Sequence, residues 1–276
     1  MRIQNLIENT EGAAGCLCEH GLSFYIEAGG RKILADTGAS GAFLTNAEKL
    51  GIDLSQVDTV IVSHGHYDHA GGLLAFAERN RGARIWINRL AAEPYYHKNN
   101  TMERYIGMDP RIKALPQVEW VEGDRTIDQG IFLFGKALGR RLWPGGNREL
   151  MRKTGEGFLQ DDFLHEQYLV LEERGKRVLI SGCAHNGILN ILDRYREIYG
   201  EEPDVVISGF HMSRKSDYSQ ADYALIRDTA RELQKLRTRF FTGHCTGELP
   251  YRILKEIMGG QIAYVHSGEE IPLEDM

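Results

Sequence analysis

Three histidines and one aspartate lie within six consecutive residues of the chain: His64, His66, Asp68 and His69. They follow a short apolar run at residues 60–62, which predicts a buried strand. Such side chains cannot be buried without partners, because each unpaired polar group costs several kcal/mol. Imidazole nitrogens and carboxylate oxygens are ordinary ligands of zinc and its first-row neighbours. The stretch therefore predicts a site for a divalent metal ion.

Histidines recur where other apolar runs end. Four runs finish in Ser or Thr and are followed within a few residues by a histidine: His64, His185, His211 and His244. A fifth run ends in the same way at Asp36. Ligands of layered α/β proteins bind where strands hand over to loops, so we expect these side chains to converge if the strands share one sheet. The histidines outside the pattern are expected to be structural or to face solvent: His20, His97, His165 and His266.

The composition is that of an ordinary soluble globule. The 276 residues are 42% hydrophobic and 26% charged, and the net charge is −6. This acidic balance argues against nucleic acid or an anionic membrane as a partner. The beginning of the chain lacks the apolar core of a signal peptide, and no apolar run approaches the roughly 18 residues of a membrane span. We therefore expect a cytoplasmic protein whose four cysteines are reduced thiols.

Helix and strand patterns alternate along the chain. Strands are predicted at 22–28, 31–35, 58–62, 84–87, 167–171, 177–180, 205–207, 239–241 and 261–265, with weaker ones at 118–121 and 131–134. Helices are predicted at 42–50, 73–79, 188–199, 220–236 and 249–258. Between about 91 and 157 the pattern loosens, which is typical of a functional or mobile insert. We expect one domain, residues 1–276, that carries this irregular insert or lid.

The motif His64-Gly-His66-Tyr-Asp68-His69, preceded by Asp36-Thr-Gly and followed by Gly-Gly and a helix, resembles that of the metallo-β-lactamase superfamily. The resemblance covers essentially the whole chain. It implies an α/β (α+β) fold of four layers, αββα, in which two mixed β-sheets lie face to face with helices outside. It also implies one or two metal ions at an edge of the sheets.

Further motifs resemble one branch of that superfamily. They are Ser181-Gly-Cys183-Ala-His185, Gly209-Phe-His211, Thr242-Gly-His244-Cys-Thr-Gly247 and the stretch from Gln160 to Gln167. The branch is that of the 7,8-dihydropterin-6-methyl-4-(β-D-ribofuranosyl)aminobenzene-5′-phosphate synthase-like proteins. Its characterised archaeal members join a dihydropterin methyl diphosphate to an aryl ribose phosphate. The resemblance therefore implies a transferase as an alternative to a hydrolase.

The ligands are assigned to two metal ions. The first ion is assigned to His64, His66 and His185. The second ion is assigned to Asp68, His69 and His244. Zinc is the favoured metal, with iron and manganese as alternatives. Asp36 is expected to accept a hydrogen bond from a ligand histidine, the usual partner of a metal-bound imidazole, or else to cap a turn.

Two further residues have open roles. Hydrolases of the superfamily usually carry a metal-bridging aspartate where this chain has Cys183, so the thiolate is a ligand, a bridge or simply a small buried residue. His211 exceeds the six ligands assigned to the two ions. It is a candidate to contact substrate, to move a proton or to act as a further ligand. Asp68 and His211 are the catalytic candidates.

Basic residues of the insert form a candidate anion site. The cluster comprises Lys136, Arg140, Arg141, Arg148, Arg152 and Lys153. Candidate contacts to a substrate phosphate or carboxylate are Arg148, Arg214 and Lys215. The alternative is a solvated basic face. The aromatic residues that could stack on a flat substrate ring, or equally pack in the core, are Tyr95, Tyr96 and Trp143.

The sequence favours a metal-dependent enzyme with two metal ions and a small anionic substrate. In the hydrolase form, the ions lower the pKa of a bound water from about 15.7 to roughly 7, and the hydroxide attacks a phosphorylated or other anionic molecule. In the transferase form, the ions hold a diphosphate leaving group. A metal-site protein that senses a ligand without turnover is the second alternative, because a fold alone proves no chemistry. Assembly into a homo-oligomer is left open.

Overall fold

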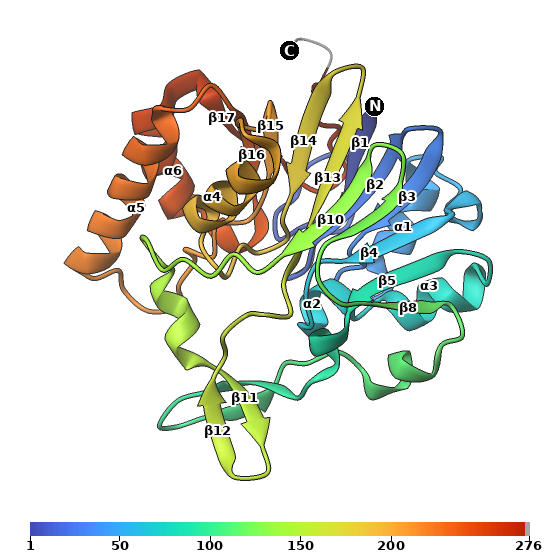
Figure 1. Cartoon of the computed structure of the whole chain (residues 1–276), viewed down its shortest axis with the longest axis horizontal. Helices are drawn as coiled ribbons and strands as arrows, with labels where there is room; N and C mark the ends of the chain where they lie inside the picture. Colours follow the sequence, from blue (N-terminus) through green and yellow to red (C-terminus); the bar gives the residue numbers. More distant parts are fainter. Residues whose placement is uncertain (274–276) are drawn as a thin grey trace.

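The computed structural model describes residues 1–273 and contains a mixed sheet built from the first part of the chain (Figure 1). Its first three strands pair antiparallel, and the remaining pairs are parallel. The strands in spatial order are β1 (Arg2–Ile7), β2 (Ser23–Ala28), β3 (Arg31–Ala35), β4 (Thr59–Val62), β5 (Arg84–Asn88) and β8 (Val118–Val121).

A second mixed sheet comes mostly from the later part of the chain. Its parallel strands in spatial order are β17 (Ile262–Tyr264), β16 (Arg239–Thr242), β15 (Val205–Ile207) and β14 (Lys176–Ile180). Antiparallel strands continue the sheet in the order β13 (Gln167–Glu173), β10 (Ile131–Gly135) and β9 (Arg125–Asp128).

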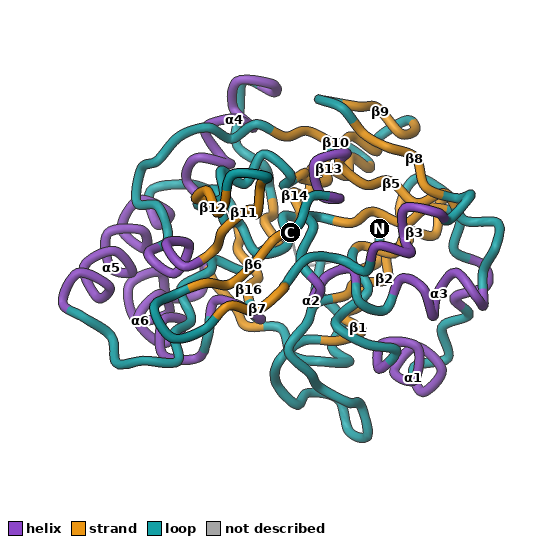
Figure 2. Tube along the Cα trace, turned by 90° about the horizontal axis from the view of Figure 1, so that it is seen from below, coloured by secondary structure: helices purple, strands orange, loops and turns teal. Residues whose placement is uncertain are grey.

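Helices cover the outer faces of both sheets (Figures 1 and 2). The first sheet carries α1 (Ala42–Lys49) and α3 (Leu73–Arg79), and the short α2 (Tyr67–Ala70) lies within the histidine motif. The second sheet carries α4 (Ile188–Tyr199), α5 (Gln220–Gln234) and α6 (Glu248–Met258). Apart from α2, which was not predicted, the helices agree with the predicted ranges to within two residues. None of the helices in residues 1–273 has the length and apolarity needed to cross a membrane.

Alternating side chains make both faces of the central strands apolar. In β4, Val60 and Val62 pack with α1 and α3, whereas Ile61 packs in the layer between the two sheets. In β15, Val206 packs with α4, α5 and α6, and its two strand neighbours face the first sheet. Side chains of a strand point alternately to opposite faces, so a fully apolar run places a strand between two covered faces. The predicted αββα sandwich is confirmed.

The region between residues 91 and 157 is more regular than the sequence suggests. It supplies β8 to the first sheet and β9 and β10 to the second. It also supplies most of a third sheet, which the sequence did not predict, in the order β12 (Gly157–Gln160), β11 (Leu150–Thr154), β6 (Tyr95–Lys98) and β7 (Glu103–Tyr105). Figure 1 shows β11 and β12 projecting from the sandwich. That the region between residues 91 and 157 acts as a lid stays a prediction.

One buried glutamine ties the two sheets together beside the histidine motif. Gln167 Nε2 donates hydrogen bonds to Val62 O at 2.8 Å and to Trp86 O at 3.0 Å. Its backbone N–H donates to Ser63 O at 2.8 Å. The start of β13 is therefore joined to the ends of β4 and β5 across the sandwich, next to the residues that precede His64.

We predict that Gln167→Leu lowers the free energy of unfolding by about 2–4 kcal/mol, because it leaves two buried carbonyls without their donor. Chemical denaturation of the metal-free protein measures this change. Gln56→Leu is the matched control, since Gln56 is exposed, and it should change stability by no more than about 0.5 kcal/mol. Equal effects of the two variants would contradict a role for Gln167 in joining the sheets.

Candidate metal centre

The candidate centre lies where the carboxyl ends of strands from both sheets meet. Four non-glycine residues in the turns at these strand ends have positive φ angles: Asp36 (59°), Ala184 (54°), His211 (49°) and His244 (49°). This left-handed conformation costs a non-glycine residue of order 1–3 kcal/mol and persists only where its surroundings enforce it. Each turn bends the chain sharply after a strand, so the strand-end side chains gather in the space between the sheets.

The candidate centre has two halves, one for each predicted donor set. In the first half two imidazoles face each other, with His64 Nε2 3.3 Å from His185 Nε2. Ser63 Oγ gives its proton to Asp36 Oδ2 at 2.7 Å and therefore accepts from His64 Nδ1 at 2.9 Å. Asn147 donates its amide to His185 O at 2.7 Å, which leaves Asn147 Oδ1 to accept from His185 Nδ1 at 3.0 Å. Both rings thus carry their proton on Nδ1, and their Nε2 lone pairs face each other.

The second half repeats this arrangement with a carboxylate behind one ring. His69 Nε2 lies 3.2 Å from His244 Nε2. His69 Nδ1 donates to Asp36 Oδ2 at 2.7 Å, as predicted for Asp36, and His244 Nδ1 donates to Asn9 Oδ1 at 2.8 Å. The outer nitrogens are again hydrogen-bonded, so the inner nitrogens are the ones available to an ion.

An aspartate and a cysteine complete this second half. Asp68 Oδ2 lies 3.3 Å from His244 Nε2 and 3.6 Å from His69 Nε2, and Cys183 Sγ lies 3.1 Å from His69 Nε2. The same sulfur also forms a group with the facing nitrogens of the first half, whose donor atoms all lie within 4.8 Å of one another. Cys183 is therefore placed between the two halves.

The spacing of the facing nitrogens suits a shared cation. Two nitrogens bound tetrahedrally to one zinc at about 2.0–2.1 Å lie about 3.3 Å apart. The observed separations are 3.3 and 3.2 Å. Imidazole, carboxylate and thiolate donors are the ligand types that zinc accepts. The two donor sets of the sequence analysis thus lie close together in space, and their action as metal ligands stays a prediction.

Burial and neighbouring charges set the protonation of these residues. Burial, reinforced by the surrounding imidazoles, lowers the pKa values of His64 and His185 well below the ordinary value of histidine. Both rings are therefore neutral. Burial also opposes charge on His69, but the Asp36 and Asp68 carboxylates raise its pKa to about 9. Burial disfavours the Asp68 carboxylate, yet the facing imidazoles hold its pKa well below the usual range. This half stabilises positive charge, and an ion must displace a proton to bind there.

His66 lies beside the first half but differs from the other rings. Its ring centroid is 4.6 Å from that of His64 and 4.8 Å from that of His185. Its Nε2 is buried and has no hydrogen-bond partner within residues 1–273, and Asp161 Oδ2 lies 4.0 Å away. Burial and the neighbouring His165 lower the pKa of His66 to about 3, so this ring is neutral as well.

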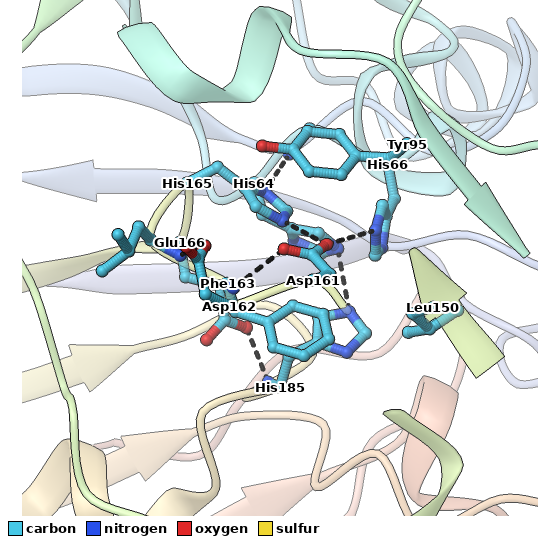
Figure 3. Close-up of polar contacts among 12 residues, drawn as sticks. His64, His66, Tyr95, Leu150, Asp161, Asp162, Phe163, His165, Glu166 and His185 are labelled. Carbon is cyan, nitrogen blue, oxygen red and sulfur yellow. Dashed lines mark hydrogen bonds and ion pairs between the residues drawn. The ribbon is translucent and has the colours of Figure 1, made fainter. Parts of the chain in front are cut away.

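The segment 161–167 contacts the site in a way that the sequence analysis did not predict (Figure 3). The Phe163 ring stacks on His185 with centroids 4.7 Å apart and an interplanar angle of 4°. The Glu166 carboxylate accepts hydrogen bonds from the backbone N–H groups of His185 at 2.6 Å and of Asn186 at 2.9 Å. The segment appeared in the sequence only as a family motif, because polar residues in an expected loop carry no periodic signal.

His20 was expected to be structural or to face solvent, and its exposed side chain agrees with this, but His20 also contacts residues of the candidate centre. His20 Nε2 lies 3.4 Å from Asp68 Oδ2, and its ring stacks on His244 with centroids 5.2 Å apart. Asn9 Nδ2 donates to His20 Nδ1 at 3.2 Å. The His20 side chain is 59% exposed, so it forms part of the rim of the site. No spacing pattern linked His20 or Asn9 to the motif 40 or more residues away.

His211 lies at the other side of the cluster. Its ring centroid is 4.1 Å from that of His185, and its Nδ1 is buried without a partner in the part of the chain that the structure describes. His211 lines a small hollow together with Gly146 and Arg214. This position fits a contact with a ligand that approaches His185 from that hollow.

Of the candidate anion contacts, Arg214 lies at the hollow that His211 lines. Arg214 Nη2 pairs with Asp222 Oδ1 at 2.7 Å at the edge of the hollow. Arg148 and Lys215 are exposed, and neither has an ion pair among the described residues, so their roles stay predictions. Of the aromatic candidates, Tyr95 and Trp143 belong to a small apolar cluster, which fits core packing.

Comparison with known proteins places this geometry in a family. The family model of the metallo-β-lactamase superfamily matches residues 17–240. The crystal structure of a metal-dependent hydrolase of the β-lactamase superfamily is similar, with a TM-score of 0.83, 33% identity and 99% of each chain covered. Two Methanocaldococcus jannaschii proteins are each 28% identical.

One of these proteins is the 7,8-dihydropterin-6-methyl-4-(β-D-ribofuranosyl)-aminobenzene-5′-phosphate synthase, matched over 92% of this chain and 90% of its own length. The other is an uncharacterised protein, matched over 78% of this chain and 81% of its own length. The resemblance seen in the histidine motif is confirmed by these matches, and the chain belongs to the metallo-β-lactamase superfamily.

Proposed function

We propose that this protein is a metallohydrolase that uses two divalent metal ions, with zinc favoured, to hydrolyse a phosphorylated or otherwise anionic small molecule. One observation carries the proposal: two pairs of buried imidazole nitrogens face each other at 3.3 and 3.2 Å while their outer nitrogens are already hydrogen-bonded. Such nitrogens are suited to sharing an ion. The similar crystal structure of a metal-dependent hydrolase supports hydrolysis as the reaction.

The chain's own residues provide orientation and proton transfer. When bound, the divalent ions supply Lewis acidity and lower the pKa of a coordinated water toward neutrality. Asp68, whose side chain is 11% exposed at the centre, orients the attacking water by accepting its hydrogen bond. His211, beside His185 at the hollow, delivers a proton to the leaving group. Asp36 keeps His69 in the orientation that presents Nε2.

In this proposal Cys183 would help to hold both ions. Its sulfur belongs to the donor groups of both halves, and thiolate is an ordinary zinc ligand. Burial raises the pKa of the Cys183 thiol well above its ordinary value, so binding of the ions must release its proton. Its thiolate would be a softer ligand than the carboxylate that the resemblance implies at this position, which favours a reaction other than plain β-lactam hydrolysis.

A transferase is the second candidate function. It is favoured by the Methanocaldococcus jannaschii synthase, which aligns with 92% of this chain. In that form the same residues would hold the ions, which would supply Lewis acidity to a diphosphate leaving group, and a carbon or nitrogen nucleophile would take the place of water. A metal-site sensor without turnover is the remaining alternative, and substrate assays separate all three.

We predict that metal-loaded protein releases product from one or more members of a phosphoester panel without any second substrate. A chelator should abolish this activity, and readdition of zinc should restore it. Product formation only when a pterin diphosphate and an aryl ribose phosphate are both present would favour the transferase. Binding of either compound without turnover, by a fully loaded protein, would favour the sensor.

Replacement of zinc by cobalt tests whether Cys183 is a metal ligand. The cobalt protein should show a near-ultraviolet thiolate-to-metal charge-transfer band, which Cys183→Ser removes. Cys245→Ser is the matched control, because Cys245 is also buried but belongs to neither of the two proposed ligand sets, and the band should persist. Loss of the band in Cys245→Ser with its persistence in Cys183→Ser would refute the assignment.

We predict that replacing His211 lowers catalysis without removing a metal ion. His211→Asn should lower kcat by about 10²–10⁴-fold, the usual effect of removing a general acid, while two ions per chain remain bound. The control is His97→Asn, which alters a histidine of β6 that pairs with Glu149. The kcat of this variant should stay within twofold of the native value. Loss of an ion from the His211 variant would instead identify His211 as a ligand.

A further inference from the structure

We propose that Arg104, at the rim of the site, binds a second anionic group of the substrate, remote from the bond that reacts. The substrate class is then a small molecule with two oxyanions, one held at the ions and one, a phosphate or a carboxylate, held by this guanidinium. This inference rests on the proposed function. It assigns a role to a residue that is not among the candidate anion contacts named above.

The backbone fixes Arg104 relative to the histidine motif. Arg104 belongs to β7, which lies near α2 in Figure 2. The Tyr67 N–H, inside the motif, donates to Ile106 O at 2.8 Å. His66 also pairs with Gly107 in an isolated antiparallel bridge. Arg104 therefore lies two residues before a segment that is hydrogen-bonded to the motif itself.

The register of the third sheet turns the Arg104 side chain toward the site. Arg104 lies directly opposite His97 on β6, and such opposite residues share one face of a sheet. Tyr95 is two residues before His97, so it lies on this face as well. The buried Tyr95 ring has its centroid 5.9 Å from that of His66. The face that carries Arg104 is therefore the one that borders the candidate centre.

The guanidinium of Arg104 lies over the Tyr67 ring, with its Cζ 5.0 Å from the ring centroid. Stacking of this kind engages the flat face of the guanidinium. The N–H edge stays available, and its fork of donors matches the two oxygens of a phosphate or carboxylate. The ring therefore orients Arg104 without occupying the donors that an anion needs.

The carboxylates nearest to Arg104 in the sheet are paired with other cations. Glu103, the preceding residue, pairs with Lys98 at 3.1 Å. Glu149 pairs with His97 Nε2 at 2.8 Å, although His97 is the residue opposite Arg104. The Arg104 side chain is exposed, and it makes neither an ion pair nor a hydrogen bond with any residue of 1–273. Its charge is thus left for an anion from solution.

A row of rings leads from the second half of the centre to Arg104. The His20 ring stacks on His244 with centroids 5.2 Å apart, and the Tyr67 ring follows at 6.4 Å from His20. Arg104 covers Tyr67 at the end of the row. These short steps suit a small molecule that lies along the rim with one anionic end at the ions. Binding energy from the remote end can then position the reacting end.

A series of non-hydrolysable ligands tests the proposal on the zinc-loaded whole chain. Alkane-α,ω-bisphosphonates and ω-phosphonoalkanoates of increasing length carry a second anion, and alkylphosphonates of the same lengths do not. At the length that spans the row, we expect calorimetry to show about 10- to 100-fold tighter binding of one doubly anionic series. A preference for the bisphosphonate identifies a remote phosphate, and a preference for the phosphonoalkanoate identifies a remote carboxylate.

Arg104→Gln should remove this preference and leave the affinity for the alkylphosphonate unchanged. Arg111→Gln is the matched control, because this exposed arginine pairs with Asp109 at 2.7 Å, and the preference should persist. A preference that survives Arg104→Gln, or a zinc-loaded native chain that binds all three series equally or not at all, would overturn this inference alone. A native chain that binds no zinc would overturn both this inference and the proposed function.

Discussion

The centre depends on a destabilising contact: inner imidazole nitrogens that are buried and face each other. His64 and His185 are 3.3 Å apart, and both are held as Nδ1–H tautomers. Without a positive charge between them, two lone pairs at this distance repel each other in a medium of low dielectric constant. The rest of the structure must therefore hold these rings in place, and the centre gains stability only when a cation enters.

The fold meets this constraint by bringing rigid strand ends together from two sheets. The first sheet contributes Asp36 and the histidine motif, and the second contributes Cys183, His185 and His244. An apolar layer between the sheets fixes the separation of the two groups. Gln167 and the segment before it cross from one sheet to the other beside the site, so the same residues that join the sheets also support the ligands.

Much of this could be predicted from the sequence, and the failures have a common cause. The alternation in β4 and β15 is a local pattern that indicated the sandwich, which is confirmed. The spacing from His64 to His69 is also local, and the metal ligands that it indicates stay a prediction. Asn9, His20 and Asp161 sit in loops, where a polar residue has no periodic pattern and its partner is decided by tertiary packing. The third sheet was missed because its strands are short and half exposed, which gives weak alternation.

Anomalous diffraction from zinc-loaded crystals shows whether the facing imidazole pairs bind the ions. We predict two peaks per chain, one bound by His64 Nε2 and His185 Nε2 and the other by His69 Nε2 and His244 Nε2, at about 2.0–2.1 Å from each nitrogen. Two peaks that share Cys183 Sγ would agree fully with the proposed bridge. Zinc bound elsewhere, with neither facing pair in contact with an ion, would contradict this arrangement.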